Sequence, residues 1–179
     1  MARVKMVEVA EATGKAKEVF DDIKKNFGMV PNLFKTLALK PDILEANWEK
    51  VKAVMMQGEL PRDLKEMVAV VVSQANGCRY CVRAHGTALK MLGTPRDKVL
   101  QIIENIDGAD ISSPVKKVLK LSVKATREPN NITDTELNEI KALGYSDTQI
   151  VELLSVVDLF TSFNKFLDTL QVEIDFPAI

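Results

Sequence analysis

Apolar positions recur every three or four residues along most of the chain, which is the period of an amphipathic helix. One such stretch begins after Thr13 and stops at Gly28, and the next is opened by Pro41 and stopped by Gly58. Asn-Gly and Asp-Gly dipeptides occur, but they stand between helical stretches and not between alternating ones, so they do not indicate hairpins. The pattern predicts a chain built from helices.

The later helices carry signals for their starts and ends. A Thr or Ser followed by proline suits an N-cap and the first helical position, because the proline's missing N–H does no harm there. A capping box pairs a Ser or Thr with a Glu or Gln three residues later. The first kind of start stands at Thr94-Pro95 and Ser113-Pro114, the second at Thr133 to Glu136 and Ser146 to Gln149, and the glycine stops are Gly93 and Gly144.

Residues 67–72 are rich in β-branched side chains and, taken alone, resemble a buried strand. The stretch that contains them runs from Pro61 to Ala75 without a turn residue, which is too long for a typical strand. Tertiary burial commonly overrides the weak helix propensity of valine. We therefore predict a helix here and an all-α fold for the chain.

The last long stretch, from Ser146 to about Glu173, is apolar on most of its sides. Such a helix must be buried all round, either as a central core helix or at a subunit interface. Phe160, Phe163 and Phe166 are the candidate anchors of a homo-oligomer, unless they fill the monomer's own core. Residues 61–93 and 146–172 also share a plan of cap, apolar helix, polar break and second apolar stretch, which suggests an internally duplicated helical hairpin.

A length of 179 residues predicts one domain over residues 1–179. The net charge is −1, and no run of Lys or Arg interleaves with aromatic residues, which excludes nucleic acid and anionic membranes as expected partners.

The first residues lack a signal-peptide core, and the longest apolar run is far shorter than a membrane span, so we expect a cytoplasmic protein. Thiols stay reduced there, and a close cysteine pair is then catalytic or metal-binding.

The candidate chemistry lies in Cys78, Cys81 and His85, which are the only cysteines and the only histidine of the chain. Their spacing of i, i+3 and i+7 places them within about 60° of one another on one helix face. Gly77 can end the preceding helix, which would put Cys78 at a helix N-terminus, where N–H groups and the macrodipole stabilise a thiolate. The arrangement is typical of a dithiol redox centre, in which a sulfenic acid on one cysteine condenses with the other.

Two arguments about the attacking cysteine point in opposite directions. The helix terminus favours Cys78, whereas Cys81 lies one turn before His85 and can pass its proton to the imidazole. We favour Cys81 for attack on peroxide, and Cys78 for resolution and for exchange with the reductant. Buried structural cysteines and a zinc site are the alternatives, although zinc prefers four ligands and Glu66 would have to be the fourth.

The motif also resembles a known family. Glu66, eleven residues, then Cys78-x-x-Cys81-x-x-x-His85 matches the signature of the alkyl hydroperoxidase D-like, carboxymuconolactone decarboxylase-like family. The resemblance covers roughly residues 12 to 172, including Gly28 to Phe34 and Leu60 to Asp63. It implies a compact all-helical fold whose cysteine pair lies in a helical hairpin, a proton relay of Glu66 and His85, and a peroxide or disulfide as substrate.

The resemblance further implies a dithiol reductant such as a lipoyl-bearing protein, and a trimer or hexamer whose active sites lie near subunit contacts. We expect no cofactor and no bound metal. The best-known members carry a second histidine before the second cysteine, where this chain has Tyr80, a residue that could support the relay by passing a proton or orienting a water. The alternatives are a carboxymuconolactone decarboxylase-type lyase, which needs no cysteine pair, and a non-catalytic metal-binding helical protein.

Overall fold

A computed structural model describes residues 2–179, and these residues form helices and connecting loops with no β-strand among them. The predicted all-α fold is therefore confirmed. The elements in chain order are η1 (Val9–Glu11), α1 (Gly14–Phe27), α2 (Asn32–Leu37), α3 (Pro41–Val51), the π-helical turn η2 (Lys52–Met56), α4 (Arg62–Asn76), α5 (Arg79–Met91), α6 (Arg96–Glu104), α7 (Ser113–Arg127), η3 (Pro129–Asn131), α8 (Asp134–Ala142) and α9 (Asp147–Leu170).

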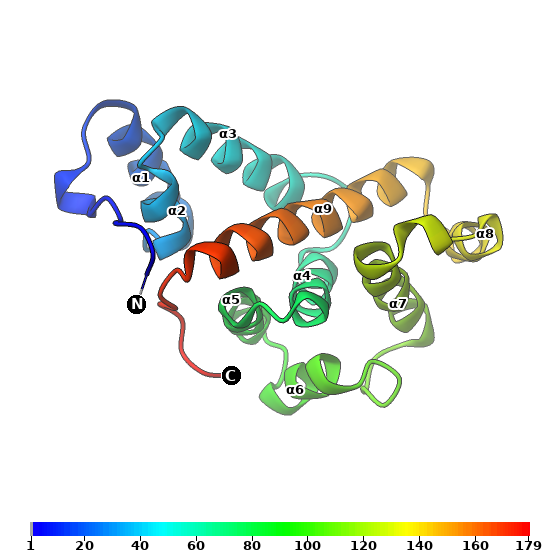
Figure 1. Cartoon of the computed structure of the whole chain (residues 1–179). Coiled ribbons are helices and arrows are strands. Elements are labelled where there is room, and N and C mark those ends of the chain that lie inside the picture. The colour runs from blue at the N-terminus through cyan, green and yellow to red at the C-terminus, as the bar shows by residue number, and fades with distance from the viewer. Residues whose placement is uncertain (1) are drawn as a thin grey trace.

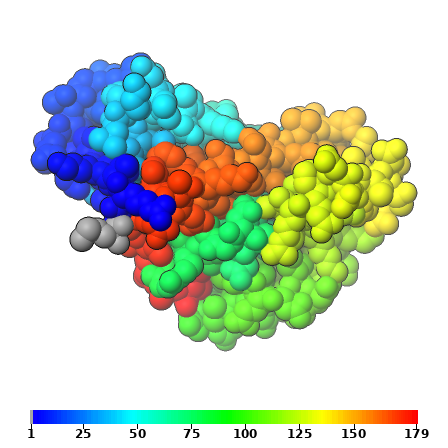
Figure 2. All heavy atoms as spheres, viewed as in Figure 1, coloured from blue at the N-terminus to red at the C-terminus, as the bar shows by residue number. Residues whose placement is uncertain are grey.

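The long helix α9 crosses the molecule between two groups of helices (Figure 1). On one side lie α1, α2 and α3, and on the other lie α4, α5 and α7, with α6 beneath them. α4 packs against α5, α7 and α9, so α4 and α9 together form the centre of the core. Seen from outside, the C-terminal half of α9 forms a band between the blue N-terminal helices and the green α5 region (Figure 2).

Burial of α9 decides between the two interpretations of its apolar surface. Phe160 and Phe163 are buried in the monomer's core, and Phe166 is half-buried against it. The prediction that Phe160 and Phe163 anchor a subunit interface is therefore wrong, because neighbouring helices already cover those sides of α9. Only Val151 and Leu154 remain exposed as large apolar side chains of this helix.

The predicted helix over residues 67–72 is confirmed, since α4 contains them all and buries each one. The capping boxes at Thr133 and Ser146 are both present. Two starts differ by one residue from the prediction. The N-cap of α6 is Pro95 in place of Thr94, and the N-cap of α7 is Ser112 in place of Ser113.

Within residues 2–179, no helix has the length and apolar character needed to cross a membrane. One domain over residues 1–179 stays a prediction, and so does the internal duplication of the helical hairpin.

Candidate functional site

The turn between α4 and α5 places Cys78 at a helix start. Gly77 adopts a left-handed conformation with a φ of 77°, which ends α4, and the Cys78 N–H then donates to the Ser73 carbonyl at 2.9 Å. Cys78 becomes the N-cap residue of α5, and Cys81 and His85 follow within the helix. The expected position of Cys78 at a helix N-terminus is thereby confirmed, and free N–H groups at that end favour a thiolate.

Glu66 lies on α4 with 1% of its surface exposed, and its two oxygens have different partners. The Arg62 Nε donates to Oε1 at 2.7 Å, and Nδ1 of His85 lies 2.6 Å from Oε2. Burial acts to raise the pKa of Glu66, but His85 and Arg62 outweigh it and lower the pKa below its ordinary value. Glu66 is therefore a carboxylate at neutral pH, and it joins α4 to α5 beside the cysteine pair.

Arg62 was not among the residues expected in the site. It precedes Glu66 by one helical turn, the spacing at which oppositely charged side chains meet, so the sequence did contain a signal for it. The guanidinium also donates to the Met55 carbonyl at 3.2 Å, which fixes the arginine against the turn before α4.

The imidazole of His85 is oriented from two sides. Its Nδ1 faces the Glu66 carboxylate, so the proton on this nitrogen is held there and Nε2 is the nitrogen free for proton exchange. The Phe160 ring from α9 meets the imidazole edge to face, with a centroid separation of 4.3 Å. Only the tertiary fold brings Phe160 to this place.

The two cysteines are present as thiols, and both are buried. The pKa of Cys78 is lowered, chiefly because the Cys81 thiol donates a hydrogen bond to its sulfur. The pKa of Cys81 is raised, first by this same bond and then by burial. The lowered pKa of Cys78 and its place at the start of α5 therefore favour Cys78 as the thiolate, in place of our preference for Cys81.

Tyr80 lies beside the site but has other partners. Its hydroxyl accepts a hydrogen bond from the Leu33 N–H at 3.2 Å, and its ring packs edge to face on Phe176 of the C-terminal segment. Burial raises the pKa of Tyr80, and the nearby Asp175 carboxylate raises it further. These contacts assign Tyr80 to anchoring the α2 start and the C-terminal segment against α5, which leaves little support for a role in the relay.

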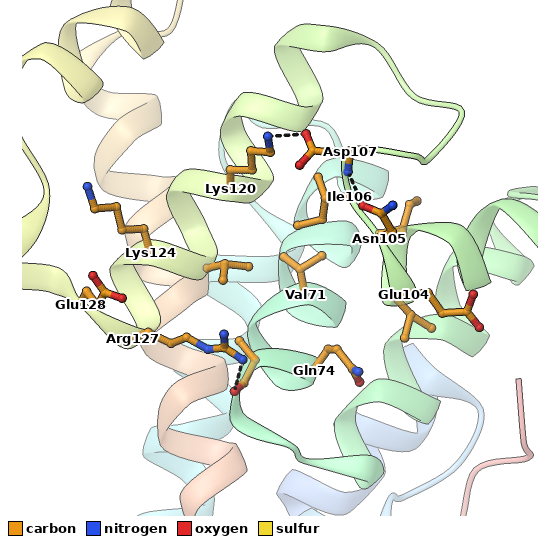
Figure 3. Close-up of a pocket in the computed structure, with 14 residues that line it drawn as sticks. Val71, Gln74, Glu104, Asn105, Ile106, Asp107, Lys120, Lys124, Arg127 and Glu128 are labelled. Carbon is orange, nitrogen blue, oxygen red and sulfur yellow. Dashed lines mark hydrogen bonds and ion pairs between the residues drawn. The ribbon is translucent and has the colours of Figure 1, made fainter.

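Two grooves of the surface have neither cysteine among their lining residues. One, with a volume of about 600 Å³, runs between α4, α6 and α7. In this groove Lys120 pairs with Asp107, and Arg127 donates to the Ala75 carbonyl near the end of α4 (Figure 3). Among residues 2–179, no three His, Cys, Asp or Glu side chains are grouped so as to hold a metal ion.

Comparison with known sequences identifies relatives of this site. Residues 41–121, which run from α3 into α7, match the model of the carboxymuconolactone decarboxylase family. Over 90 residues, or 50% of the chain, the sequence is 31% identical to a protein of Mycobacterium tuberculosis named alkyl hydroperoxide reductase. That match covers 26% of the relative, so the chain spans about a quarter of the relative's length.

Comparison with solved structures extends the likeness to nearly the whole chain. A Ralstonia eutropha structure described as an alkylhydroperoxidase AhpD core and a peroxidase-related protein has a TM-score of 0.90 at 25% identity, covering 97% of this chain and 92% of its own. A debrominase bound to 2,3,4-tribromopyrrole shares the fold, with a TM-score of 0.83 at 21% identity over 96% of this chain and 91% of its own. The match to the family model over residues 41–121 includes all four signature residues, and the fold is shared with the R. eutropha structure over 97% of the chain, so the predicted resemblance to the alkyl hydroperoxidase D-like, carboxymuconolactone decarboxylase-like family is confirmed.

Proposed function

We propose that this protein is a thiol-dependent peroxidase or disulfide reductase whose redox pair is Cys78 and Cys81. The observation that supports it most is the combination of a cysteine with a lowered pKa at the N-terminus of α5, a second thiol one turn later, and a histidine in the same helix that is paired with the buried Glu66. The names of the M. tuberculosis and R. eutropha relatives support a peroxide-related role. The debrominase shows that the same fold also serves other reactions, so the site has to carry the assignment.

The proposed reaction begins with the Cys78 thiolate. Its sulfur attacks the terminal oxygen of a hydroperoxide, the O–O bond breaks, and the departing alkoxide takes a proton to leave as an alcohol. Cys78 is then a sulfenic acid. The Cys81 sulfur attacks it, the S–O bond breaks, and hydroxide combines with the Cys81 proton to leave as water, so that a Cys78–Cys81 disulfide forms. Glu66 holds His85 so that Nε2 can exchange protons in both steps.

A dithiol reductant would complete the cycle by two successive thiol–disulfide exchanges. Each exchange breaks one disulfide and forms another, and the second leaves the reductant oxidised and both protein cysteines reduced. A lipoyl-bearing protein is the class of reductant that we expect from the family. The same chemistry without peroxide would make the protein a disulfide reductase.

Peroxide treatment is expected to join Cys78 to Cys81 in a reversible disulfide. Mass spectrometry of the peptide that spans both residues should show the loss of two hydrogen atoms, reversed by dithiothreitol, because a sulfenic acid one helical turn from a thiol condenses readily. A Cys81→Ser variant is the control and should stop at the sulfenic acid. Two free thiols that survive excess peroxide in the unmodified protein would refute the redox function and favour the lyase or the non-catalytic alternative.

We also propose that the protein is a homo-oligomer, a trimer or a hexamer. Leu143 just after α8 and Val151 and Leu154 in the first turns of α9 are exposed apolar side chains, and they replace the buried phenylalanines as candidate contacts. Light scattering after size exclusion should give a multiple of 19.9 kDa, and Val151→Asp should lower it. A monomer mass across a wide range of dilution would contradict the proposal.

A further inference from the structure

Buried polar side chains from α4 and α9 meet beside the cysteine pair. Ser73 and Asn164 are 0% and 1% exposed, and the Asn164 Nδ2 donates to the Ser73 Oγ at 3.0 Å. Asn76, the last residue of α4, donates its Nδ2 to the Asn164 Oδ1 at 2.9 Å. Polar groups are buried at this depth only when they have hydrogen-bond partners. Apolar contacts alone could join helices α4 and α9 here, so packing of the two helices does not require the polar cluster.

The directions of these hydrogen bonds determine which hydrogen atoms of Ser73 and Asn164 remain to be donated to a neighbouring group. The Asn164 oxygen is occupied by Asn76, so the amide turns its N–H groups towards Ser73 and α5. The Ser73 oxygen accepts from Asn164, which leaves its own hydrogen to donate. Among the hydrogen bonds of the described residues, no oxygen or nitrogen accepts the Ser73 proton or the second Asn164 amide hydrogen. The sulfur of Cys81 lies within reach of both side chains, and hydrogen bonds from Asn164 and Ser73 to this sulfur act to lower the Cys81 pKa.

We propose that Ser73 and Asn164 are positioning residues which hold the sulfur of Cys81 and stabilise it as the thiolate that departs when the Cys78–Cys81 disulfide is reduced. This inference rests on the proposed function, because it assigns a role within its reductive half. Asn76 contributes by fixing the orientation of the Asn164 amide. The assignment also gives the two cysteines different roles, with Cys78 as the sulfur that forms the mixed disulfide.

The chemistry of the exchange requires such a group. A thiolate of the reductant attacks the Cys78 sulfur, a new disulfide bond forms there, the Cys78–Cys81 bond breaks, and its electron pair leaves on Cys81. A leaving thiolate of lower pKa departs faster. Cys81 is nearly fully buried, so its negative charge has little solvation from water, and hydrogen-bond donors have to replace that solvation.

The effects on the pKa of Cys81 agree with this role. Its hydrogen bond to Cys78 and its burial raise the pKa, whereas Asn164 and Ser73 lower it. Once Cys78 is bound in a mixed disulfide, its sulfur is no longer a thiolate that accepts the hydrogen of Cys81. The largest cause that raises the pKa of Cys81 is then removed. The donors then act against burial alone, at the step that needs the Cys81 thiolate.

The test is a titration of Cys81 by itself. In a Cys78→Ala background, the ultraviolet absorbance of the thiolate as a function of pH should give a higher Cys81 pKa for Ser73→Ala than for unmodified Ser73. Each unit of increase lowers the thiolate fraction at neutral pH about tenfold. Ser73→Thr retains the hydroxyl and should restore the titration. Asn164→Leu, of similar volume, provides a second variant if Ser73→Ala does not fold.

Ser122→Ala is the matched control, because Ser122 is an equally buried serine whose hydroxyl donates to the Val118 carbonyl within α7, away from Cys81. With both cysteines present and the disulfide formed by diamide, Ser73→Ala should slow reduction by dithiothreitol several-fold, and Ser122→Ala should not. An unchanged Cys81 titration in folded Ser73→Ala and Asn164→Leu would overturn the inference. The titration requires no peroxide turnover, so its result stands apart from any failure of the peroxidase function.

Discussion

Glu66→Gln is expected to slow the oxidation of the cysteine pair by peroxide by about 10²–10⁴-fold, the range that positioned proton-transfer groups contribute. The carboxylate receives hydrogen bonds from both Arg62 and His85, and a neutral amide can accept at only one of its two positions. The amide NH₂ would then face either the guanidinium or the imidazole, and His85 would lose the partner that fixes its Nδ1 proton. His85→Ala should have an effect in the same range, since Glu66 acts through it.

The measurement is the rate of thiol loss under excess peroxide, together with alkylation of the free cysteines at neutral pH. Asp63→Asn is the control, because Asp63 is an exposed carboxylate on the same helix. The pKa of Glu66 is lowered, so the carboxylate stays ionised to below the ordinary glutamate range, and its contribution to the oxidation rate is lost only as the pH falls through that lowered pKa. Unchanged rates in both Glu66→Gln and His85→Ala would leave the two residues with a structural role only.

Glu152→Gln is expected to lower the free energy of unfolding by about 3–5 kcal/mol, the cost of breaking a buried ion pair from one side. Glu152 of α9 pairs with the ammonium of Lys65, which is 2% exposed on α4, and it also accepts from the backbone N–H groups of Glu59 and Leu60. The lysine's remaining hydrogen bonds go to main-chain carbonyls, including that of Val54 at 2.9 Å. Without the carboxylate, the buried ammonium would lose its only counter-ion among these contacts.

Chemical denaturation followed by circular dichroism measures this change. Lys50→Met supplies the control, because Lys50 and Asp158 also join α3 to α9 by an ion pair but both side chains are largely exposed, so the loss should stay below about 1 kcal/mol. Burial raises the pKa of Glu152, but Lys65 and the two N–H groups lower it overall. The contribution to stability is therefore present above the ordinary glutamate range and is lost as the pH falls through the lowered pKa. Equal losses in the buried and exposed pairs would contradict the prediction.

Most of the helical framework could be predicted from the sequence because its signals are local. The capping boxes at Thr133 and Ser146 need only the residues within one turn, and the glycine that ends α4 needs only its own backbone freedom. Proline-based starts were less exact. Both Pro95 and Pro114 are near helix starts as expected, but the capping residue depends on where the chain enters the helix, and this shifts the N-cap by one position.

The apolar surface of α9 could not be assigned from the sequence. A helix that is apolar on most sides is equally compatible with a core and with an interface, because periodicity describes which sides are apolar and not what covers them. The packing of α4, α5 and α7 covers Phe160 and Phe163, and only Val151 and Leu154 remain exposed. The covered and exposed sides were decided by elements distant in the chain.

The candidate site divides in the same way. By itself, the sequence determined that Cys78, Cys81 and His85 share one helix face and that Cys78 starts the helix, since spacing along one helix fixes these relations, whereas Glu66 was expected in the site only from the resemblance to the family signature. Only the tertiary structure decided that Glu66 is shared between Arg62 and His85, that Phe160 orients the imidazole, and that Asn164 meets Ser73 beside Cys81. The physical reason is that the pKa of a buried thiol depends on its solvation and on its hydrogen-bond donors, and one of the two donors to Cys81, Asn164, comes from α9, some eighty residues away in the chain.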